Sequence, residues 1–366
     1  MVLVLYSIIL IYVIAIGLLL YGFSKINTFD AIGCSPKTTF TIVVPFRDET
    51  ESLPILLDSF SKLNYPKHLF EIILIDDDAV KKFQLPNLDY KISLIHNHRI
   101  SNSPKKDAIT TAVQFVTTEW IITTDADCVV PKNWLATLDE YIQNTAVSMI
   151  AGAVSYDCKS SFLHHFQLLD FTSLQGATIG SFGLGKGFMC NGANFAYTKS
   201  FFVELNGFKG NDTLASGDDV FLLQKAMAQF PEKVQYLKSR STIVVTKPLN
   251  NWKSLFHQRL RWVSKTTAFH SSFGISLGIV VFLANLAWLY ATVCLLLGLF
   301  SINEIMVFFL LKFLIEMVLF YRTNQFLSDT KIDYLLLGSL VYPFFSTGVA
   351  LYSLFGKYEW KGRLFK

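Results

Sequence analysis

Charged side chains are scarce in this sequence. Lys, Arg, Asp and Glu together make 16% of its 366 residues, whereas hydrophobic residues make 52%. A soluble globular domain carries about 25% charged residues, so the composition excludes a wholly soluble protein. The deficit lies at the two ends of the chain, because residues 38–265 have an ordinary mixed composition. We therefore expect the ends to form a membrane part around a folded middle domain.

Paired cysteines are lacking as well. The chain has five, with no Cys-x-x-Cys spacing, which excludes a disulfide framework and a structural zinc site; they are Cys34, Cys128, Cys158, Cys190 and Cys294. Together with the basic residues that flank the middle domain, this predicts that the domain lies in the reducing cytosol of a bacterial cell, at the inner membrane. The N-terminus then lies on the outer side.

A large excess of positive charge is also missing, since the net charge is only +4. The conspicuous basic residues lie just before an apolar run or at the C-terminus, where they indicate contact with lipid head groups, not nucleic acid. They are Arg259, Arg261, Lys265, Lys357, Lys361, Arg363 and Lys366. We expect a membrane as partner and no nucleic acid.

Four long apolar runs are present, at 2–23, 274–300, 304–321 and 334–355. Three of them exceed, and the run at 304–321 approaches, the roughly 20 residues that a membrane-crossing helix needs. The first has neither the basic start nor the cleavage site of a signal peptide, so residues 1–24 are predicted to be an anchor. Residues 273–356 are predicted to be the C-terminal membrane segments and 357–366 a basic tail.

Four crossings would leave the basic tail on the same side as the N-terminus, against the positive-inside tendency. We therefore expect Pro343 to mark a re-entrant break that returns the tail to the cytosol. Within the third run, Lys312 and Glu316 lie four residues apart. Ionisable groups in a membrane are costly, so these two are expected to pair with each other inside a helix bundle.

The middle domain alternates strand and helix patterns. Apolar, β-branched stretches predict strands at 38–46, 71–77, 90–97 and 120–124, and helical spacing predicts helices at 51–63 and 105–117. This alternation predicts an α/β fold with a mainly parallel sheet covered by helices. The domain is assigned to residues 38–248, and an amphipathic segment at the membrane surface to 249–272.

Acidic residues follow three of the predicted strands, at 48–49, 76–78 and 125–127. In an open parallel sheet, ligands bind at the carboxyl ends of the strands. Asp125 and Asp127 flank one small residue, so both can reach one site at this edge. Hard oxygen ligands of this kind suit Mg²⁺ or Mn²⁺. The alternative is a solvated turn, in which Asp is also common.

Seven motifs occur in an order and at a spacing that resembles the membrane-bound family 2 glycosyltransferases of GT-A fold. That group is related to ceramide glucosyltransferase, cellulose synthase and bacterial carotenoid or hopanoid sugar transferases. The motifs are VVPFRDE (43–49), IDDDA (75–79), PKKDA (104–108), TTDADC (123–128), CNGANFAYTKSFF (190–202), SGDDVFL (216–222) and QRLRW (258–262). The resemblance covers about residues 38–265 and implies a GT-A (Rossmann-like) catalytic domain.

The resemblance also implies roles for individual residues. A nucleotide-sugar donor, with UDP the usual nucleotide, would be held by residues of five of these motifs. They are Pro45, Arg47, Glu49, Asp76, Asp77, Lys105, Asp125, Gln258, Arg261 and Trp262. Asp127, with Asp125, would ligate the metal. Asn191, Gly192, Asp218 and Trp262 would lie on the acceptor side.

Asp219 falls where the family has its general base, which would take a proton from the acceptor hydroxyl during an inverting transfer. Two plainer interpretations remain beside these roles. Either Asp218 or Asp219 can cap a helix that begins at Val220, and we assign the cap to Asp218. The QRLRW segment can be an interfacial helix with a Trp anchor, and both roles are compatible. Gly183, Gly185 and Gly187 are expected in a segment that covers the substrate, because they lack the strand-to-helix context of a phosphate loop.

A catalytic domain flanked by membrane segments favours an acceptor hydroxyl presented at the bilayer surface, such as that of a lipid. A processive polysaccharide synthase of the same family is the alternative enzyme, although it would need more membrane spans for a channel. A non-catalytic membrane scaffold with a transferase fold is the alternative of another class. The presence of every acid and base that the chemistry needs argues against the scaffold.

Overall fold

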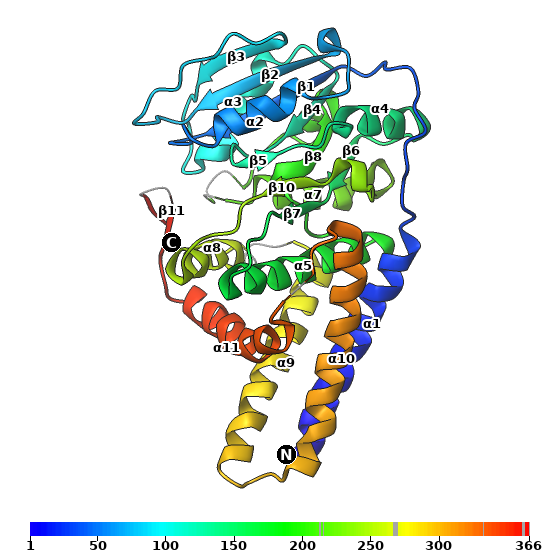
Figure 1. Ribbon diagram of the computed structural model, residues 1–366, viewed down its shortest axis with the longest axis vertical. Coiled ribbons are helices and arrows are strands. Elements are labelled where there is room, and N and C mark those ends of the chain that lie inside the picture. The colour runs from blue at the N-terminus through cyan, green and yellow to red at the C-terminus, as the bar shows by residue number, and fades with distance from the viewer. Residues whose placement is uncertain (212–213, 215, 266–269, 332, 361–362, 366) are drawn as a thin grey trace. The chain divides into compact units, whose positions relative to one another are not determined.

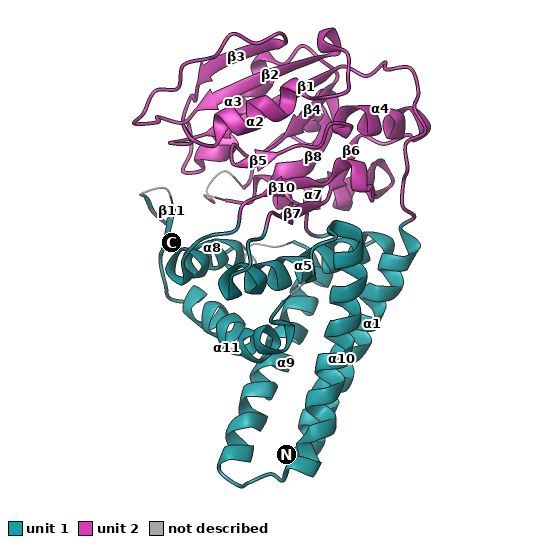
Figure 2. Ribbon diagram, in the orientation of Figure 1, with its two compact units in different colours: residues 1–26, 158–188, 248–366 teal, residues 27–157, 189–247 magenta. Residues whose placement is uncertain are grey.

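The protein is described by a computed structural model that covers residues 1–365 apart from 212–213, 215, 266–269, 332 and 361–362. The chain forms two compact units (Figure 2). One, the membrane-helix unit, contains residues 1–26, 158–188 and 248–366. The other, the sheet unit, contains residues 27–157 and 189–247. Residues 158–188, within the range expected for the catalytic domain, thus belong to the membrane-helix unit.

The sheet unit is built on a seven-stranded sheet with the order β3-β2-β1-β4-β8-β6-β9 (Figure 1). Four of its six pairings are parallel, and only β8 runs against its two neighbours. The mainly parallel α/β fold expected from the sequence is therefore confirmed. The strands are β1 (Phe40–Phe46), β2 (Phe70–Asp76), β3 (Lys91–His96), β4 (Trp120–Thr123), β6 (Met149–Gly152), β8 (Phe195–Thr198) and β9 (Val234–Leu237).

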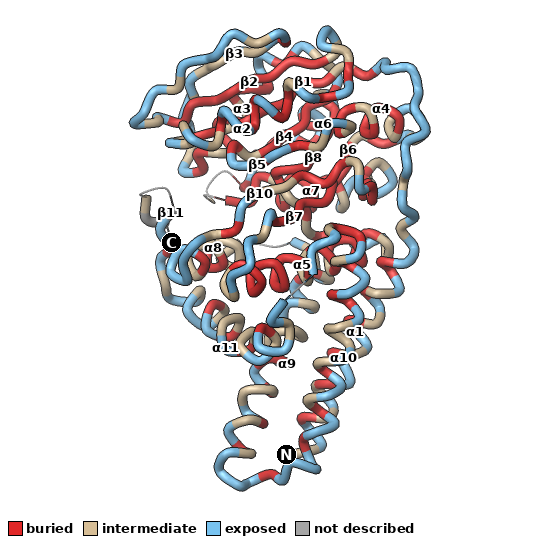
Figure 3. The backbone as a smooth tube through the Cα atoms, in the orientation of Figure 1, coloured by how far each residue is buried: buried red, intermediate tan, exposed pale blue. Residues whose placement is uncertain are grey.

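The central strand β1 lies between β2 and β4 and is parallel to both, with Phe46 opposite Asp76 and Val43 opposite Thr123. Strands covered on both faces are apolar along their length, and β1, β2 and β4 are buried almost throughout (Figure 3). The carboxyl ends of the three strands therefore meet at one edge of the sheet. We call it the carboxyl edge.

Helices connect these strands, and α3 packs against β1 and β2. Pro104 occupies the first turn of α3, where its missing N–H costs no hydrogen bond. The helices are α2 (Leu53–Ser61), α3 (Pro104–Phe115), α4 (Trp134–Asn144), α6 (Lys199–Glu204) and α7 (Asp218–Gln229). The described residues also form four 3₁₀ helices, η1 (Lys67–Leu69), η2 (Gly192–Asn194), η3 (Pro231–Lys233) and η4 (Arg240–Thr242).

A smaller sheet has the order β5-β10-β7. Its strands are β5 (Cys128–Val129), β10 (Val244–Thr246) and β7 (Val154–Tyr156). The buried side chain of Asn194 donates to the carbonyls of Ala153 and Thr242, each at 2.8 Å, and accepts from Trp134 Nε1 at 3.0 Å. This one amide thus ties together segments that flank the two sheets.

The membrane-helix unit contains six helices and a short strand pair among its described residues. The helices are α1 (Val2–Lys25), α5 (Phe162–Gly183), α8 (Trp252–Val263), α9 (Ser272–Leu296), α10 (Ile302–Leu327) and α11 (Leu335–Ser353). Strands β11 (Tyr358–Trp360) and β12 (Arg363–Phe365) pair antiparallel. Of the expected basic tail, Lys361 and Lys366 lie outside the described residues.

Each of the four predicted apolar runs forms a helix. By length and composition, α1, α9 and α11 are sufficient to cross a membrane. Helix α10 is longer, with 26 residues, but any eighteen consecutive residues of it include three ionisable ones. By composition, α10 is therefore a weaker candidate for a membrane span than α1, α9 and α11.

Helices α1, α9 and α10 share an apolar core. Helix α1 contributes residues at alternating intervals of four and three, the spacing of a seam between packed helices; they are Leu5, Ile9, Tyr12, Ile16 and Leu19. Inside this core, Lys312 Nζ lies 2.5 Å from Glu316 Oε1, which also accepts from Tyr12 Oη at 2.6 Å. The pairing expected from the sequence is confirmed, and Tyr12 adds a third partner.

Helices α1 and α5 approach each other so closely that their contact requires glycine. A Cβ atom on Gly183 would lie 1.8 Å from the carbonyl oxygen of Gly22, and one on Gly22 would lie 2.1 Å from that of Gly180. The expectation that Gly183 belongs to a segment covering the substrate is wrong, because Gly183 is the last residue of α5 and packs against α1.

We expect Gly183→Ala to destabilise the protein by about 1–3 kcal/mol, the usual cost of overpacking, because the two backbones must move apart. Gly17→Ala is the matched control, since nothing lies within 4 Å of a Cβ built on that residue of α1. Thermal unfolding of both variants in detergent measures the difference. Equal midpoints for the two would show that α1 and α5 do not pack at Gly183.

Candidate active site

The carboxyl edge begins with two sharp chain reversals. Asp48, two residues beyond β1, has φ 56°, and Asp78, two residues beyond β2, has φ 55°. Left-handed backbone is costly for most residues, but Asp and Asn tolerate it better than others. Asp48 Oδ1 also accepts from the backbone N–H of Val80 at 2.7 Å. The two reversals are thus linked.

Of the predicted donor-binding residues, Asp76 and Asp77 lie at the end of β2 and are buried. Arg99 holds Asp77 with two hydrogen bonds, Nε to Oδ1 at 2.7 Å and Nη2 to Oδ2 at 2.8 Å. Asn97 Nδ2 donates to the same Oδ1 at 2.7 Å. Sequence reasoning did not select Arg99 or Asn97, although Asn97 ends the predicted strand that pairs with β2 and Arg99 lies two residues beyond it.

Pro45, Arg47 and Glu49 lie along the end of β1. Pro45 is within the strand, and Arg47 Nε lies 3.6 Å from Asp48 Oδ2. The carbonyl of Glu49 accepts from the backbone N–H groups of Ser52 and Leu53 at the start of α2. The three residues are half-buried, so part of each side chain remains accessible to a ligand at the carboxyl edge.

Lys105, in the first turn of α3, lies at the centre of a group of acids. Its Nζ is 2.7 Å from Asp125 Oδ1 and 3.3 Å from Asp218 Oδ2. Burial lowers the pKa of the ammonium, but the charges of Asp125, Asp218 and Asp219 outweigh it and hold the pKa well above its usual value. Lys105 therefore keeps its proton at physiological pH. The structure brings together four residues that lie in three motifs.

Asp219, the predicted base, is oriented by backbone amides. Its Oδ2 accepts from the N–H of Gly192, and its Oδ1 from that of Val220, both at 2.8 Å. A Cβ on Gly192 would lie 3.1 Å from both Asp218 Oδ2 and Lys105 Nζ, so any side chain there would press on the acid group. Thr123 Oγ1, at the end of β4, donates to the Gly192 carbonyl at 2.7 Å. Asn191, the residue before Gly192, is the N-cap of η2.

The prediction that Asp218 caps α7 is wrong. The helix begins at Asp218 itself, and its N-cap is Gly217 with φ 86°, a conformation that favours glycine. Asp218 is buried and faces Lys105, whereas Asp219 is half-buried. Both acids also lie in the first turn of α7, where the helix dipole stabilises negative charge. The helix dipole therefore stabilises both carboxylates in their charged form, whatever their chemical role.

Lys106, which the sequence did not single out, supports the same region. Its buried Nζ donates to the carbonyls of Asn211 and Leu214, the latter at 2.9 Å, and lies 5.0 Å from the centre of the Phe221 ring. These carbonyls precede Asp218 in the chain. The available signal was two consecutive lysines in the first turn of a helix, where the dipole disfavours cations.

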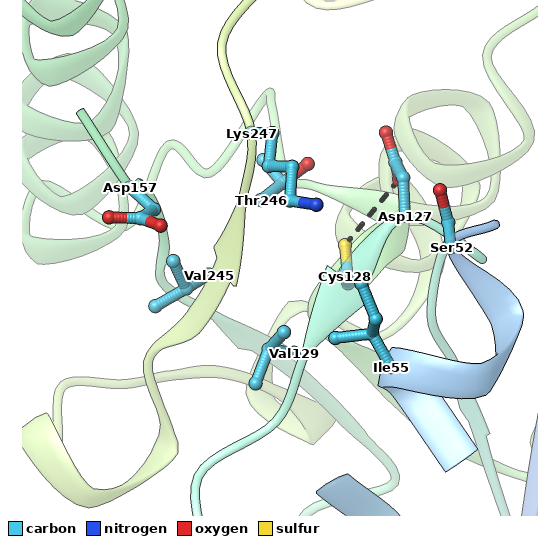
Figure 4. Close-up of a pocket in the computed structure, with 9 residues that line it drawn as sticks. All are labelled: Ser52, Ile55, Asp127, Cys128, Val129, Asp157, Val245, Thr246 and Lys247. Atoms are coloured by element: carbon cyan, nitrogen blue, oxygen red, sulfur yellow. Dashed lines mark hydrogen bonds between the residues drawn. The ribbon is translucent and has the colours of Figure 1, made fainter. Parts of the chain in front are cut away.

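Asp127 points into a pocket of the sheet unit, shown in Figure 4. The pocket has charged residues at its rim and aliphatic ones on its walls. It is lined by Ser52, Ile55, Asp127, Cys128, Val129, Asp157, Val245, Thr246 and Lys247. Burial, followed by the charges of Asp127 and Asp125, raises the pKa of Cys128. This thiol therefore stays protonated and unreactive at neutral pH.

The described residues contain no group of three or more His, Cys, Asp or Glu side chains that could hold a metal ion by themselves. Mg²⁺ sites that bind nucleotides often use only one or two carboxylates, with substrate phosphates and water as the other ligands. Asp125 and Asp127 supply two carboxylates directly after β4. The donor set thus fits a metal that arrives with a phosphorylated substrate.

The QRLRW residues belong to the membrane-helix unit, on α8. The side chain of Gln258 accepts from Arg259, and the Trp262 ring packs at a tilt against that of Phe171 with centroids 6.1 Å apart. Burial raises the pKa of Tyr358 on β11, and a side-chain hydrogen bond with Ser264 and the charge of Arg261 partly offset this rise. The C-terminal strand therefore lies against the motif.

Arg259 has a different role from the one the sequence indicated. It was expected to contact lipid head groups, but its side chain is buried and its Nε lies 2.5 Å from Asp170 Oδ2 on α5. Its guanidinium also lies 4.1 Å from the centre of the Trp262 ring. Head-group contact is therefore wrong for Arg259, which links α8 to α5 and fixes two residues of the motif.

The sheet unit is thus a mainly parallel α/β sheet with carboxylates at the ends of adjacent strands, where such sheets bind their ligands. Residues 41–205 match the model of glycosyl transferase family 2. The chain contains a domain of this family and is a glycosyltransferase. The matched range includes the motifs from Glu49 to Gly192, and it ends before Asp219 and QRLRW.

A solved glycosyltransferase structure shares this fold. The mannosyltransferase PcManGT from Pyrobaculum calidifontis, in complex with GDP-Man and Mn²⁺, is 16% identical with a TM-score of 0.59. The alignment covers 96% of this chain and 99% of that one. Residues 1–349 of TarS from S. aureus are 13% identical with a TM-score of 0.43, over 89% and 95% of the two chains. No curated protein sequence matches the chain.

We expect Arg259→Met to destabilise the protein by about 3–5 kcal/mol, because it leaves the Asp170 carboxylate buried without its partner. Adding Asp170→Leu should restore most of the loss, since the charge is then removed as well. Lys253→Met, at an exposed position of the same helix, is the control and should change stability by less than about 0.5 kcal/mol. Thermal unfolding in detergent compares the four proteins. A double variant as unstable as Arg259→Met would contradict the pairing.

Proposed function

We propose that the protein transfers a sugar, with inversion, from a nucleotide-sugar to the hydroxyl of a lipid or another acceptor presented at the membrane surface. The observation that carries this proposal is the grouping of Lys105, Asp125, Asp218 and Asp219 at the carboxyl edge. It joins a cation suited to phosphate with a carboxylate suited to general base catalysis.

Asp219 is the proposed base. An inverting transfer needs one carboxylate to take the proton of the acceptor hydroxyl as its oxygen attacks the anomeric carbon and the bond to the diphosphate breaks. Asp219 is only half-buried and is held in one orientation by two backbone amides. Asp218 is buried and faces Lys105, so it is less available to accept a proton and instead fixes the lysine beside Asp219.

The donor would be held along the carboxyl edge. Asp77 and Glu49 are the proposed contacts of the nucleoside, with Asp76 and Arg47 as neighbours and Pro45 shaping the strand end. Asp77 is already fixed by Arg99, which reduces the reorganisation needed on binding. Lys105 can donate to a phosphate oxygen of the donor in place of a carboxylate oxygen, because both are anionic hydrogen-bond acceptors.

A divalent cation, Mg²⁺ or Mn²⁺, would be held by Asp125 and Asp127 together with the donor phosphates. When bound, it would neutralise charge on the departing diphosphate. Arg261 is proposed to contact the diphosphate, Gln258 to support it, and Trp262 to border the acceptor. Asn191 and Gly192 are proposed acceptor-side residues. The complex of PcManGT with GDP-Man and Mn²⁺ supports a nucleotide-sugar and a divalent metal for this fold.

The membrane supports the acceptor class. Three helices are apolar and long enough to cross a bilayer, and an enzyme anchored this way meets lipid hydroxyls at the interface. The five cysteines are free thiols, which accords with a catalytic domain in the cytosol. We propose the bacterial inner membrane as its location.

Detergent-purified protein should release nucleotide from one member of a panel of UDP-, GDP- and dTDP-sugars when Mn²⁺ or Mg²⁺ and lipid extract are supplied, and EDTA should abolish the release. We expect Asp219→Asn to lower kcat about 10²–10⁴-fold while donor affinity is kept, since only the proton transfer is lost. Asp127→Ala should weaken donor binding in the presence of metal.

Asp58→Asn is the control for a changed surface carboxylate, because Asp58 is exposed on α2 and pairs only locally with Lys62. It should leave turnover unchanged. If Asp219→Asn turns over like the parent protein, Asp219 is not the base. If no nucleotide-sugar binds under any metal condition, the proposed donor class is wrong.

A further inference from the structure

Helices α9 and α10 of the membrane-helix unit both pack against α1 and share an apolar core with it. Helix α1 is parallel to α10, because contacts advance together along both. Tyr6 Oη donates to the Glu304 carbonyl at 2.9 Å, and Arg322 Nη2 lies 3.3 Å from Ser24 Oγ. At about 1.5 Å per residue, the 26 residues of α10 span about 39 Å. Helix α10 is therefore long enough to cross wherever α1 crosses.

Helix α9 runs in the opposite direction. Its first residues lie near the end of α5, since Phe273 and Phe188 have ring centroids 5.7 Å apart, and α5 in turn contacts the last turns of α1. Near its other end, Tyr290 lies 3.8 Å from the sulfur of Met1. The start of α1 and the link between α9 and α10 therefore share one end of the bundle. The end of α1, the start of α9 and the end of α10 share the other.

Helix α11 does not follow this direction, although its composition suits a membrane span. In Figure 1 it lies across α9 and beside α8 and α5. Tyr334, just before α11, has its ring 5.8 Å from Phe162 in the first turn of α5. Tyr352, in the last turn of α11, has its ring 5.6 Å from Phe256 of α8.

Helices α5 and α8 are themselves packed side by side. Phe162 and Trp252, at their starts, have centroids 6.0 Å apart, and Phe171 and Trp262 are paired further along. A crossing helix of 19 residues would separate its ends by about 28 Å across the bilayer. Both ends of α11 instead contact this one pair of helices. Because α5 packs against the last turns of both α1 and α10, we place this pair of helices, and with it both ends of α11, at that one end of the bundle.

We propose that the chain crosses the membrane three times, through α1, α9 and α10, and that α11 lies along the membrane surface. The outer side of α11 would face the acyl chains beneath the head groups; its exposed apolar residues include Leu336, Leu337, Leu340, Phe344, Leu351 and Leu354. Three crossings place the C-terminal strands on the side where the sheet unit begins at Asn27. The re-entrant break expected at Pro343 is not needed, because α11 continues through that residue.

The distribution of charge supports this assignment. The link between α9 and α10, residues 297–301, contains no Lys or Arg. The opposite end of the bundle carries Lys25, Arg322, Lys331 and Lys357. Short links rich in Lys and Arg stay on the cytosolic side. With α10 as the third and last crossing, this rule is obeyed. A fourth crossing through α11 would put the basic tail on the opposite side of the membrane.

The test uses a membrane-impermeant maleimide on sealed inside-out vesicles and on intact spheroplasts. Cys34, which is exposed and belongs to the sheet unit, reports the side of that unit in the parent protein. In a Cys34→Ser, Cys158→Ser background, single cysteines are introduced by Asn303→Cys, Lys331→Cys and Lys357→Cys, all at exposed positions outside the helix bundle core.

We expect the cysteines introduced at 331 and 357 to label from the same side as Cys34, and the one at 303 to label only from the other side. Labelling of positions 331 and 357 from opposite sides would overturn the proposal, because α11 would then cross. Labelling of positions 303 and 331 from one side would also overturn it, because α10 would not cross.

An epitope fused to the C-terminus of the parent sequence gives the same information without substitutions. Antibody should reach it from the side that labels Cys34. None of these measurements depends on catalysis, so their outcome is independent of the proposed transferase reaction.

Discussion

The acids that follow β4 and begin α7 depend on one shared cation, Lys105. Asp125 follows β4, and Asp218 and Asp219 begin α7, so the fold gathers carboxylates from separate elements at one place. Like charges this close would repel one another and favour protonation. The positive charge of Lys105 compensates these carboxylates, and their negative charges in turn raise the pKa of Lys105. Helix α3 must therefore begin at this edge, and its packing on β1 and β2 ensures that it does.

The same turn of α3 also organises the segment that leads to α7. Lys106, next to Lys105, binds the Asn211 and Leu214 carbonyls, so two consecutive lysines fix both the acids and the approach to them. Gly192 completes the arrangement, because its backbone N–H holds Asp219 while its missing side chain leaves room for Lys105. The geometry of Asp219, the proposed base, is thus set by groups that need not touch a substrate.

Buried charged side chains are also paired with opposite charges in the membrane-helix unit. Arg259 pairs with Asp170, and Lys312 pairs with Glu316 beside Tyr12. Such pairs add little net stability, because desolvation offsets their attraction. Breaking one is costly, however, so each pair selects which helices lie together. Arg259 therefore aligns α8, which carries Gln258, Arg261 and Trp262, with α5.

Local patterns in the sequence determined strands β1 to β4, helices α2 and α3, and the acids at the carboxyl edge. They could do so because strand alternation is local and parallel strands bring their carboxyl ends together. The sequence also identified the Lys312–Glu316 pair, whose partners are one helical turn apart.

Only the tertiary structure decided which partner each remaining residue has. Arg259 and Arg261 are two positions apart and alike in sequence, yet Arg259 is buried against Asp170, 89 residues away. Arg99 on Asp77, Gly183 against Gly22 and Gly217 as the cap of α7 are decided in the same way. Helices α10 and α11 show the reason most clearly. Composition measures how well a helix tolerates lipid, but contacts at both ends of the helix determine whether it crosses.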